Sequence, residues 1–329
     1  MKTVVGTVAG VVAGSRENGW RMRGGWRGWS WRQAGRRGFL VLTAALVLAG
    51  CQAPPVLPDE VPAGLSEPRV PRPPRIGLAL GGGAARGFAH IGVIQVLEEA
   101  GIRADLVTGT SAGSLVAALY ASGRNGTELA TLAMAMDESV LTDWVFPARG
   151  VIRGEALARF VREHTAGATI DQMRLPLGIV ATDLDSGQPV LFRRGDTGLA
   201  VRASSAVPAV FLPVRIGPRE YVDGGLVAPV PVRFARDMGA EVVIAVDVST
   251  PPDGAPTHDT MRLLLQTFAI MGKRINHFEL AQADVVLRPQ LSGVSSTDFT
   301  ARRRAIDAGR DAALAALPAI RVRLVELTR

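Results

Sequence analysis

The feature that most constrains the fold is an alternation of short apolar runs and amphipathic segments that begins at residue 75. "RIGLAL" (75–80) predicts a buried strand, and "GFAHIGVIQVLEEAG" (87–101) predicts a helix that ends at Gly101. "ADLVTGT" (104–110) predicts a second strand, and "AGSLVAALYASG" (112–123) a second helix. Strand, helix, strand and helix at this spacing predict an α/β fold with a mainly parallel sheet.

The rest of the chain continues this fold. We expect further strands at 175–184, 189–194, 211–217, 220–225 and 241–248. A long helical stretch from about 258 to 283 is expected next, then "VVLRP" and a final amphipathic helix after Thr300. An apolar fraction of 47% with 20% charged residues is typical of a globular chain with a core. We therefore predict a catalytic domain at 76–250 and a C-terminal helical extension of the same domain at 251–329.

The N-terminal segment carries the net charge. Residues 1–51 hold eight basic residues and one acid, which is the whole formal charge of +7, so the remainder is neutral and gives poor evidence for a nucleic-acid partner. The apolar run at 39–48 is shorter than the roughly 20 residues that a spanning helix needs and fits a signal peptide over residues 1–50. "RRGFL" (36–40) resembles a twin-arginine export signal, with general export as the alternative, and Met22 would give a start of ordinary length.

A lipid anchor is predicted directly after this segment. "LAGC" (48–51) resembles the lipobox of bacterial lipoproteins, in which the cysteine is lipidated; the alternative is a stray thiol in an ordinary signal peptide. Cys51 is the only cysteine, so no disulfide framework is expected. Residues 52–75 contain eight prolines and predict a semi-rigid tether. We expect a membrane-anchored lipoprotein that faces the periplasm, with Gln52 favouring the outer membrane by resemblance to enterobacterial sorting.

Two glycine-rich motifs follow the first two predicted strands. "GTSAG" (109–113) fits the G-x-S-x-G elbow, in which Gly109 and Gly113 permit a tight turn and Ser111 is a nucleophile at a helix N-terminus. "GGGAARG" (81–87) reads as an anion-holding loop. Because both follow parallel neighbouring strands, we expect them at the same edge of the sheet.

The chain offers few bases for such a serine. Its four histidines lack a local catalytic signature, and His90 is expected to pack or to form hydrogen bonds inside its helix, whereas His164, His258 and His277 are expected to be solvated. "VDGG" (222–225) supplies an acid, Asp223, although Asp-Gly is also an ordinary turn dipeptide.

Taken in order, the glycine loop with Arg-Gly, G-x-S-x-G and D-G-G resemble the patatin-like phospholipase family, and "ATDLDSGQPVLF" and "VRASSAVPAVFLPV" are similar to its bacterial members. The resemblance covers roughly residues 75–250. It implies a three-layer α/β/α fold and a Ser–Asp dyad, with Ser111 as nucleophile and Asp223 as general base and acid, followed by Gly224 and Gly225. The loop would form the oxyanion hole, but its glycines are displaced by one from the commonest family form. The amides therefore remain open among Gly82, Gly83 and Ala84, and Arg86 would shape the loop or attract a head group.

The resemblance implies a serine acyl hydrolase that cleaves carboxylic esters of phospholipids or lysophospholipids through an acyl-serine intermediate. We expect no cofactor, because the sequence has no cluster with metal-ligand spacing and no Asp-rich calcium loop. A dinucleotide site is disfavoured because Arg86 stands at the last glycine position of G-x-G-x-x-G, and no G-K-[ST] follows for a P-loop. Two alternatives remain: an α/β-hydrolase with a triad completed by His258 or His277, and a catalytically silent lipid-binding lipoprotein.

Overall fold

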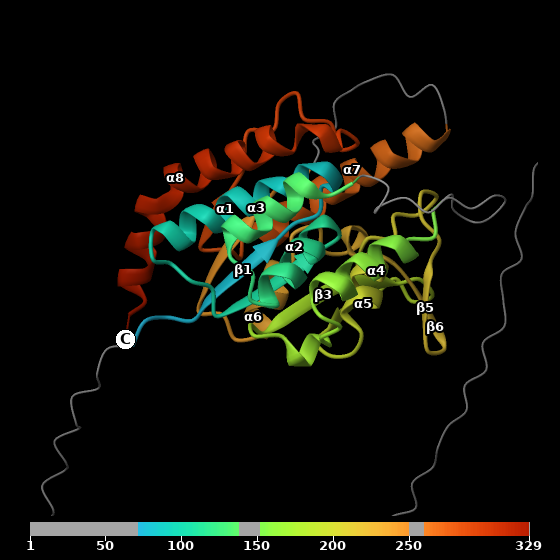
Figure 1. Cartoon of the computed structure of the whole chain (residues 1–329), viewed down its shortest axis with the longest axis horizontal. Coiled ribbons are helices and arrows are strands. Elements are labelled where there is room, and N and C mark those ends of the chain that lie inside the picture. Colours follow the sequence, from blue (N-terminus) through green and yellow to red (C-terminus); the bar gives the residue numbers. More distant parts are fainter. Residues whose placement is uncertain (1–71, 138–151, 250–259, 329) are drawn as a thin grey trace, which may run out of the picture. The chain divides into compact units, whose positions relative to one another are not determined.

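A computed structural model describes residues 72–137, 152–249 and 260–328 (Figure 1). The predicted signal peptide, Cys51 and most of the tether lie outside the described residues, as does His258. The boundaries predicted for these segments and for the catalytic domain stay predictions. None of the described helices is both long enough and apolar enough to cross a membrane.

The centre of the described chain is one mixed sheet whose strands run in the order β5-β6-β3-β2-β1-β7-β8, with β4 paired to β3. The pairs among β1, β2, β3, β7 and β8 are parallel, whereas β4, β5 and β6 form an antiparallel side. The strands are β1 (Ile76–Leu80), β2 (Leu106–Thr110), β3 (Leu177–Asp183), β4 (Pro189–Phe192), β5 (Val214–Ile216), β6 (Arg219–Asp223), β7 (Val242–Val246) and β8 (Val285–Leu287).

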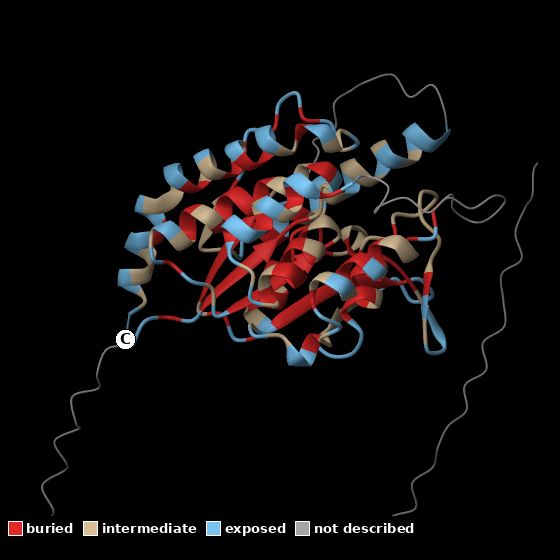
Figure 2. Cartoon of the chain, in the orientation of Figure 1, coloured by how far each residue is buried: buried red, intermediate tan, exposed pale blue. Residues whose placement is uncertain are grey.

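Helices cover both faces of this sheet. Alternate residues of β7 belong to two separate apolar clusters: Val242, Ile244 and Val246 pack with α1, α2 and α8, and Val243 and Ala245 with α6. The two faces are therefore both buried, as continuous apolar parallel strands require (Figure 2). The helices are α1 (Ala89–Glu99), α2 (Ala112–Ala121), α3 (Gly126–Ala135), α4 (Glu155–His164), α5 (Thr197–Ser204), α6 (Val232–Asp237), α7 (Thr260–Leu280) and α8 (Arg302–Glu326).

The predicted mainly parallel α/β fold is confirmed, and every predicted strand is present within a few residues of its expected bounds. The glycine loop after β1 and the turn after β2 lie at the same edge, because the two strands pair in parallel with Leu80 opposite Gly109. Four helices, α3 to α6, have no counterpart in the prediction. The start of α3 did carry a local signal, since Asn125 and Glu128 form a capping box.

Candidate active site

Ser111 occupies a strained turn between β2 and α2. Its φ of 52° and ψ of −125° are rare for a residue with a side chain, and such strain persists only where the surroundings hold it. Gly109 and Gly113 make the turn possible: a Cβ on Gly109 would lie 2.5 Å from the Gly113 carbonyl oxygen, and one on Gly113 would lie 2.1 Å from the Leu80 carbonyl oxygen. The predicted elbow geometry is therefore present in the structure.

Hydrogen bonds hold this turn from a second segment. The Ser111 backbone N–H donates to Ser204 Oγ at 2.9 Å, and the Ser204 hydroxyl donates to the Val180 carbonyl at 2.6 Å. Ser204 is fully buried at the end of α5. Sequence reasoning did not single out this residue, although its segment, "VRASSAVPAVFLPV", was part of the family resemblance.

The glycine loop lies directly against Ser111. A Cβ on Gly82 would lie 3.1 Å from Ser111 Cβ, so the loop and the turn are in close contact. Most of the loop amides are already engaged: Gly81 donates to Val246, Gly82 to Pro229, Ala85 to Ser296 and Arg86 to Gly83. The Gly83 and Ala84 amides donate to no acceptor in the described part of the chain, and Ala84 has a φ of 48°.

His90, on helix α1, forms a hydrogen bond with the glycine loop. Its Nε2 lies 2.7 Å from the Gly81 carbonyl oxygen, and since that oxygen only accepts, Nε2 carries the proton. The ring is fully buried, and burial lowers its pKa to about 4, so it is neutral at neutral pH. Burial also lowers the pKa of Arg86, partly offset by Asp247, and the buried Arg86 Nε has no hydrogen-bond partner among the described residues.

Asp223 reaches the same edge through the antiparallel side of the sheet. Thr110 pairs with Val180 on β3, and the next residue of β3, Ala181, pairs with Asp223 on β6. Because Ser111 follows Thr110, Ser111 and Asp223 stand at the same height on either side of β3. The register thus brings the two predicted dyad residues together.

The Asp223 carboxyl is buried and weakly solvated. Its Oδ1 accepts the Gly225 N–H at 2.6 Å, and Gly224 is required there because a Cβ would lie 2.2 Å from the Val180 carbonyl oxygen. Burial raises the pKa of Asp223 to about 6, although the Ser111 hydroxyl and the Gly225 N–H lower it. The hydroxyl does not complete a hydrogen bond of standard geometry, so Oδ2 remains buried without a partner among the described groups.

Histidine does not join this pair in the described residues. No described histidine forms a hydrogen bond with Ser111 or Asp223, and His258 lies outside them. The described part of the chain also has no group of three His, Cys, Asp or Glu side chains placed to hold a metal ion. The three described histidines make other contacts: His90 bonds to Gly81, His164 stacks on Phe160, and His277 is exposed beside Phe278.

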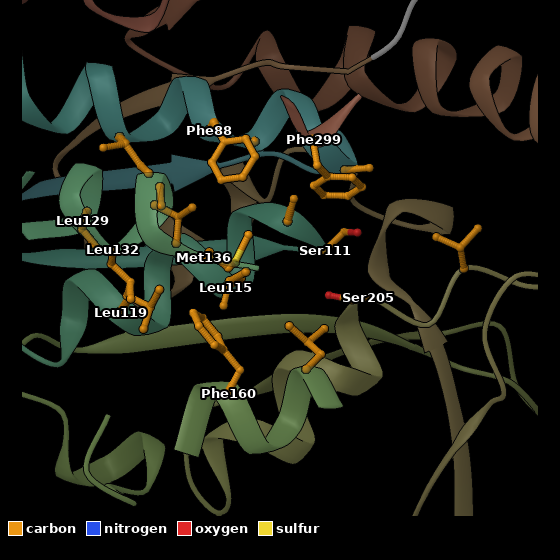
Figure 3. A pocket seen from close by; sticks show the side chains of 18 of the residues that line it. Phe88, Ser111, Leu115, Leu119, Leu129, Leu132, Met136, Phe160, Ser205 and Phe299 are labelled. Carbon is orange, nitrogen blue, oxygen red and sulfur yellow. The ribbon is translucent and has the colours of Figure 1, made fainter. Parts of the chain in front are cut away.

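An apolar cavity opens beside the Ser111 hydroxyl (Figure 3). Its floor follows one stripe of α2 at helical spacing, formed by Ala112, Leu115, Val116 and Leu119. The serine stands at one end, and the apolar side chains extend away from it, which is the arrangement needed by a polar reaction on an apolar substrate. The other walls come from separate elements: Phe88, Ile91, Leu129, Leu132, Ala133, Met136, Leu157, Phe160, Val207, Phe211 and Phe299.

Comparisons with known proteins found similar sequences and a similar fold. Residues 78–236 match the Patatin family, described as patatin-like phospholipase. An uncharacterized NTE family protein of Mycobacterium tuberculosis is 38% identical over 189 residues, which cover 56% of this chain and 52% of that one. Patatin-like phospholipase domain-containing protein 6 of Mus musculus is 33% identical over 230 residues, which cover 67% of this chain and 16% of that one.

The crystal structure of VipD from Legionella pneumophila is similar in fold, with a TM-score of 0.51 and 15% identity over 76% of this chain and 67% of that one. At that identity the likeness concerns the fold alone. The chain spans about half the length or less of the curated relatives described above.

Proposed function

Because the chain belongs to the patatin-like phospholipase family through its residues 78–236, we propose that it is a serine acyl hydrolase acting on membrane lipids. One observation carries the proposal. Ser111 stands on a strained turn at the end of an apolar cavity, next to the buried carboxyl of Asp223. The substrates would be phospholipids or lysophospholipids, with the acyl chain in the cavity.

The proposed reaction uses Ser111 and Asp223 alone. The Asp223 carboxylate takes the hydroxyl proton of Ser111 as Oγ attacks the ester carbonyl, and the carbonyl π electrons move to its oxygen. When the tetrahedral intermediate collapses, the C–O bond to the alcohol breaks and Asp223 returns the proton to that alcohol. Water then attacks the acyl-serine with the same proton transfers, releasing the fatty acid and restoring Ser111.

We assign the oxyanion hole to amides that have no other acceptor in the described structure. Those of Gly83 and Ala84 come from the loop, and that of Ala112 comes from the first residue of α2. An N–H directly after the nucleophile together with loop amides is the arrangement of serine elbows in general. Loss of one such donor typically costs about 2.7–4 kcal/mol of transition-state stabilisation. Gly82, whose amide bonds to Pro229, contributes close packing instead.

We further propose that the protein is a lipoprotein attached through Cys51 to a membrane facing the periplasm. What supports this is the sequence of residues 1–75, with its basic start, its short apolar run, "LAGC" and the proline-rich tether. Such a tether could extend to roughly 75 Å at about 3.1 Å per residue, enough for the catalytic domain to reach lipids in the membrane that holds it.

The test is product analysis on a mixed phospholipid panel with the full chain and with Ser111→Ala and Asp223→Asn. We expect free fatty acid from the wild type only, together with labelling of Ser111 by a fluorophosphonate. Both variants keeping wild-type activity while folded would refute the dyad. Failure of the wild-type serine to label would favour a silent lipid-binding protein, and loss of activity in His258→Asn or His277→Asn would favour a triad.

A further inference from the structure

Helix α8 begins with three consecutive arginines that lie in different surroundings. Arg302 is half-buried, whereas Arg303 and Arg304 are exposed. The first turn of a helix carries partial positive charge, so three cations there oppose the helix dipole. Solvent screens this repulsion for the two exposed side chains more than for Arg302. Contacts of its own therefore hold the Arg302 guanidinium in place.

The Arg302 guanidinium donates to three backbone carbonyls from two segments of the chain. Its Nη1 donates to Ala133 at 3.1 Å and to Met136 at 2.6 Å, and its Nε donates to Phe299 at 2.7 Å. Ala133 lies in the last turn of α3, where carbonyls lack a partner within the helix, and Met136 follows that turn. Hydrogen bonds from a charged donor are stronger than neutral ones, and the rigid fork of arginine directs several at once.

All three carbonyls belong to residues that line the apolar cavity. Phe88 lines it too, and its ring centroid lies 6.0 Å from the guanidinium carbon of Arg302 and 6.4 Å from the Phe299 ring, which it meets edge to face. Figure 3 shows the Phe88 and Phe299 rings on one side of the cavity and Phe160 on the other. Arg302, which does not itself line the cavity, thus joins lining residues from the start of α1, the end of α3 and the turn before α8.

A helix cap accounts for only part of this arrangement. The bonds to Ala133 and Met136 satisfy the end of α3, and they would do so wherever the arginine came from. The bond to Phe299 and the contact with Phe88 add nothing to that cap, but they fix the distance between the α3 turn and the two aromatic rings. That distance determines how closely the wall surrounds an apolar chain in the cavity.

We propose that Arg302 is a positioning residue that sets the width of the cavity between the end of α3 and the Phe88–Phe299 pair, and thereby the preference for long acyl chains. This inference rests on the proposed function, since it takes the cavity to hold the acyl chain of the substrate. Without the guanidinium, the three segments lose their common partner and the apolar wall recedes from the chain. An acetyl group, which does not extend along this wall, is unaffected.

The test compares two substitutions in the full chain. Arg302→Met keeps an unbranched apolar side chain and removes every donor, and Arg303→Met is the matched control because it removes the same charge from the exposed neighbour. For Arg302→Met, KM for decanoyl esters should rise about 10-fold, which corresponds to lost contact with between one and two methylenes. Acetyl esters should keep their kcat and KM, and Arg303→Met should change neither ester.

Two results with these variants would overturn the proposal. An unchanged KM for decanoyl esters in Arg302→Met would mean that the cavity wall does not depend on Arg302. A loss by the same factor for both esters would place the effect at the glycine loop instead. The segment before α8 reaches that loop through a hydrogen bond of 3.0 Å from the Ala85 N–H to the Ser296 carbonyl.

A second substitution, Arg302→Lys, keeps the proposal testable if the methionine variant folds poorly. Lysine keeps the charge, so it still stabilises the end of α3, but a single ammonium lacks the fork that bonds two segments at once. KM for decanoyl esters should therefore still rise severalfold in Arg302→Lys. A wild-type KM in this variant would reduce Arg302 to a helix cap and overturn the proposal.

A binding measurement separates this proposal from the proposed hydrolysis. In Ser111→Ala protein, dansyl-labelled undecanoic acid should bind, brighten and be displaced by decanoic acid. Its Kd should be about 10-fold weaker after Arg302→Met and unchanged after Arg303→Met. This pattern, in a protein whose Ser111 form hydrolyses no ester, would support the role of Arg302 and refute the hydrolase. Ester hydrolysis by the wild type together with an equal Kd in all three binding proteins would refute the role of Arg302 alone.

Discussion

The polar edge of the sheet and the apolar cavity meet at Ser111 and are held together in opposite ways. At the edge, individual hydrogen bonds fix the geometry. The Gly225 N–H donates to Asp223 Oδ1, His90 Nε2 donates to the Gly81 carbonyl, and Ser204 Oγ accepts the Ser111 N–H. The cavity wall, by contrast, is formed by many aliphatic and aromatic side chains that come from separate elements.

This difference predicts two kinds of response to mutation. Removing one partner of a buried hydrogen bond leaves the other group without a partner, and the protein then bears the full desolvation free energy of that group. At this edge, the removed group often also takes part in a step of the reaction. Losing or adding apolar volume costs about 0.8 kcal/mol per methylene and is spread over the walls. Edge variants should therefore fail with every ester, whereas cavity variants should discriminate by acyl length.

The largest effect is expected for Asp223→Asn. Without a base for the Ser111 proton, kcat should fall about 10³- to 10⁴-fold for esters of any length. The wild-type kcat/KM should rise with pH up to about 6 and then level off, because the pKa of Asp223 is raised to about 6 by burial and only the carboxylate accepts the proton. Asp185→Asn, at an exposed position, is the control. A comparable loss in that control, or a profile flat from pH 4 to 8, would contradict the role of Asp223.

The same substitution should stabilise the protein at high pH. The folded Asp223 binds its proton more tightly than the unfolded one, so stability falls as pH rises from about 4 and the cost is complete above about 6. The free energy of unfolding of Asp223→Asn, measured by urea denaturation, should therefore exceed that of the wild type by about 2–3 kcal/mol at pH 8 and by less than about 1 kcal/mol at pH 4. If the variant and the wild type have equal free energies of unfolding at both pH values, the Asp223 carboxyl is better solvated than its burial indicates.

The sequence predicted the edge better than the cavity, for a physical reason. The glycines of the loop and elbow serve local backbone geometry, so Ser111 and the loop could be placed from two strands and their connections. Asp223 was predicted as a partner through the family resemblance, but its height beside Ser111 depends on the antiparallel register of β6 on β3, which no local pattern encodes.

The remaining features arise from contacts between distant segments. The Gly82 amide is unavailable because it donates to the carbonyl of Pro229, a residue far along the chain. The motif alone therefore could not identify which loop amides are the oxyanion-hole donors. The cavity is lined by apolar residues of α1, α2, α3 and α4 and by Phe299. In the sequence these residues cannot be distinguished from ordinary core positions. Six large apolar residues of α7 are exposed, and their identities in the sequence do not distinguish them from core positions.

A smaller effect at the edge is expected for His90. His90→Phe removes the donor to the Gly81 carbonyl and lets the loop shift, which should lower kcat about 10- to 100-fold with little change in KM. His90→Gln, which keeps an N–H donor of similar reach, should recover most of this loss. A role in packing alone predicts the opposite order, because phenylalanine fills the buried site better than glutamine does.

The smallest effect belongs to the cavity. Leu132→Trp adds bulk to a half-buried position away from Ser111 (Figure 3). The stripe from Ala112 to Leu119 advances about 10 Å, which matches about eight carbons of an extended acyl chain at roughly 1.25 Å each. Excluding two methylenes costs about 1.6 kcal/mol, so KM for decanoyl esters should rise about 15-fold while acetyl esters stay unchanged.

The control for this substitution is Leu314→Trp, on the exposed surface of α8, which should change neither ester. Comparing acyl lengths in Leu132→Trp and His90→Phe then separates the two regions. The edge variant should lower every rate by the same factor, and the cavity variant only those of chains long enough to reach Leu132. If both variants discriminate by length, the loop and the cavity move as one unit and the division between them does not hold.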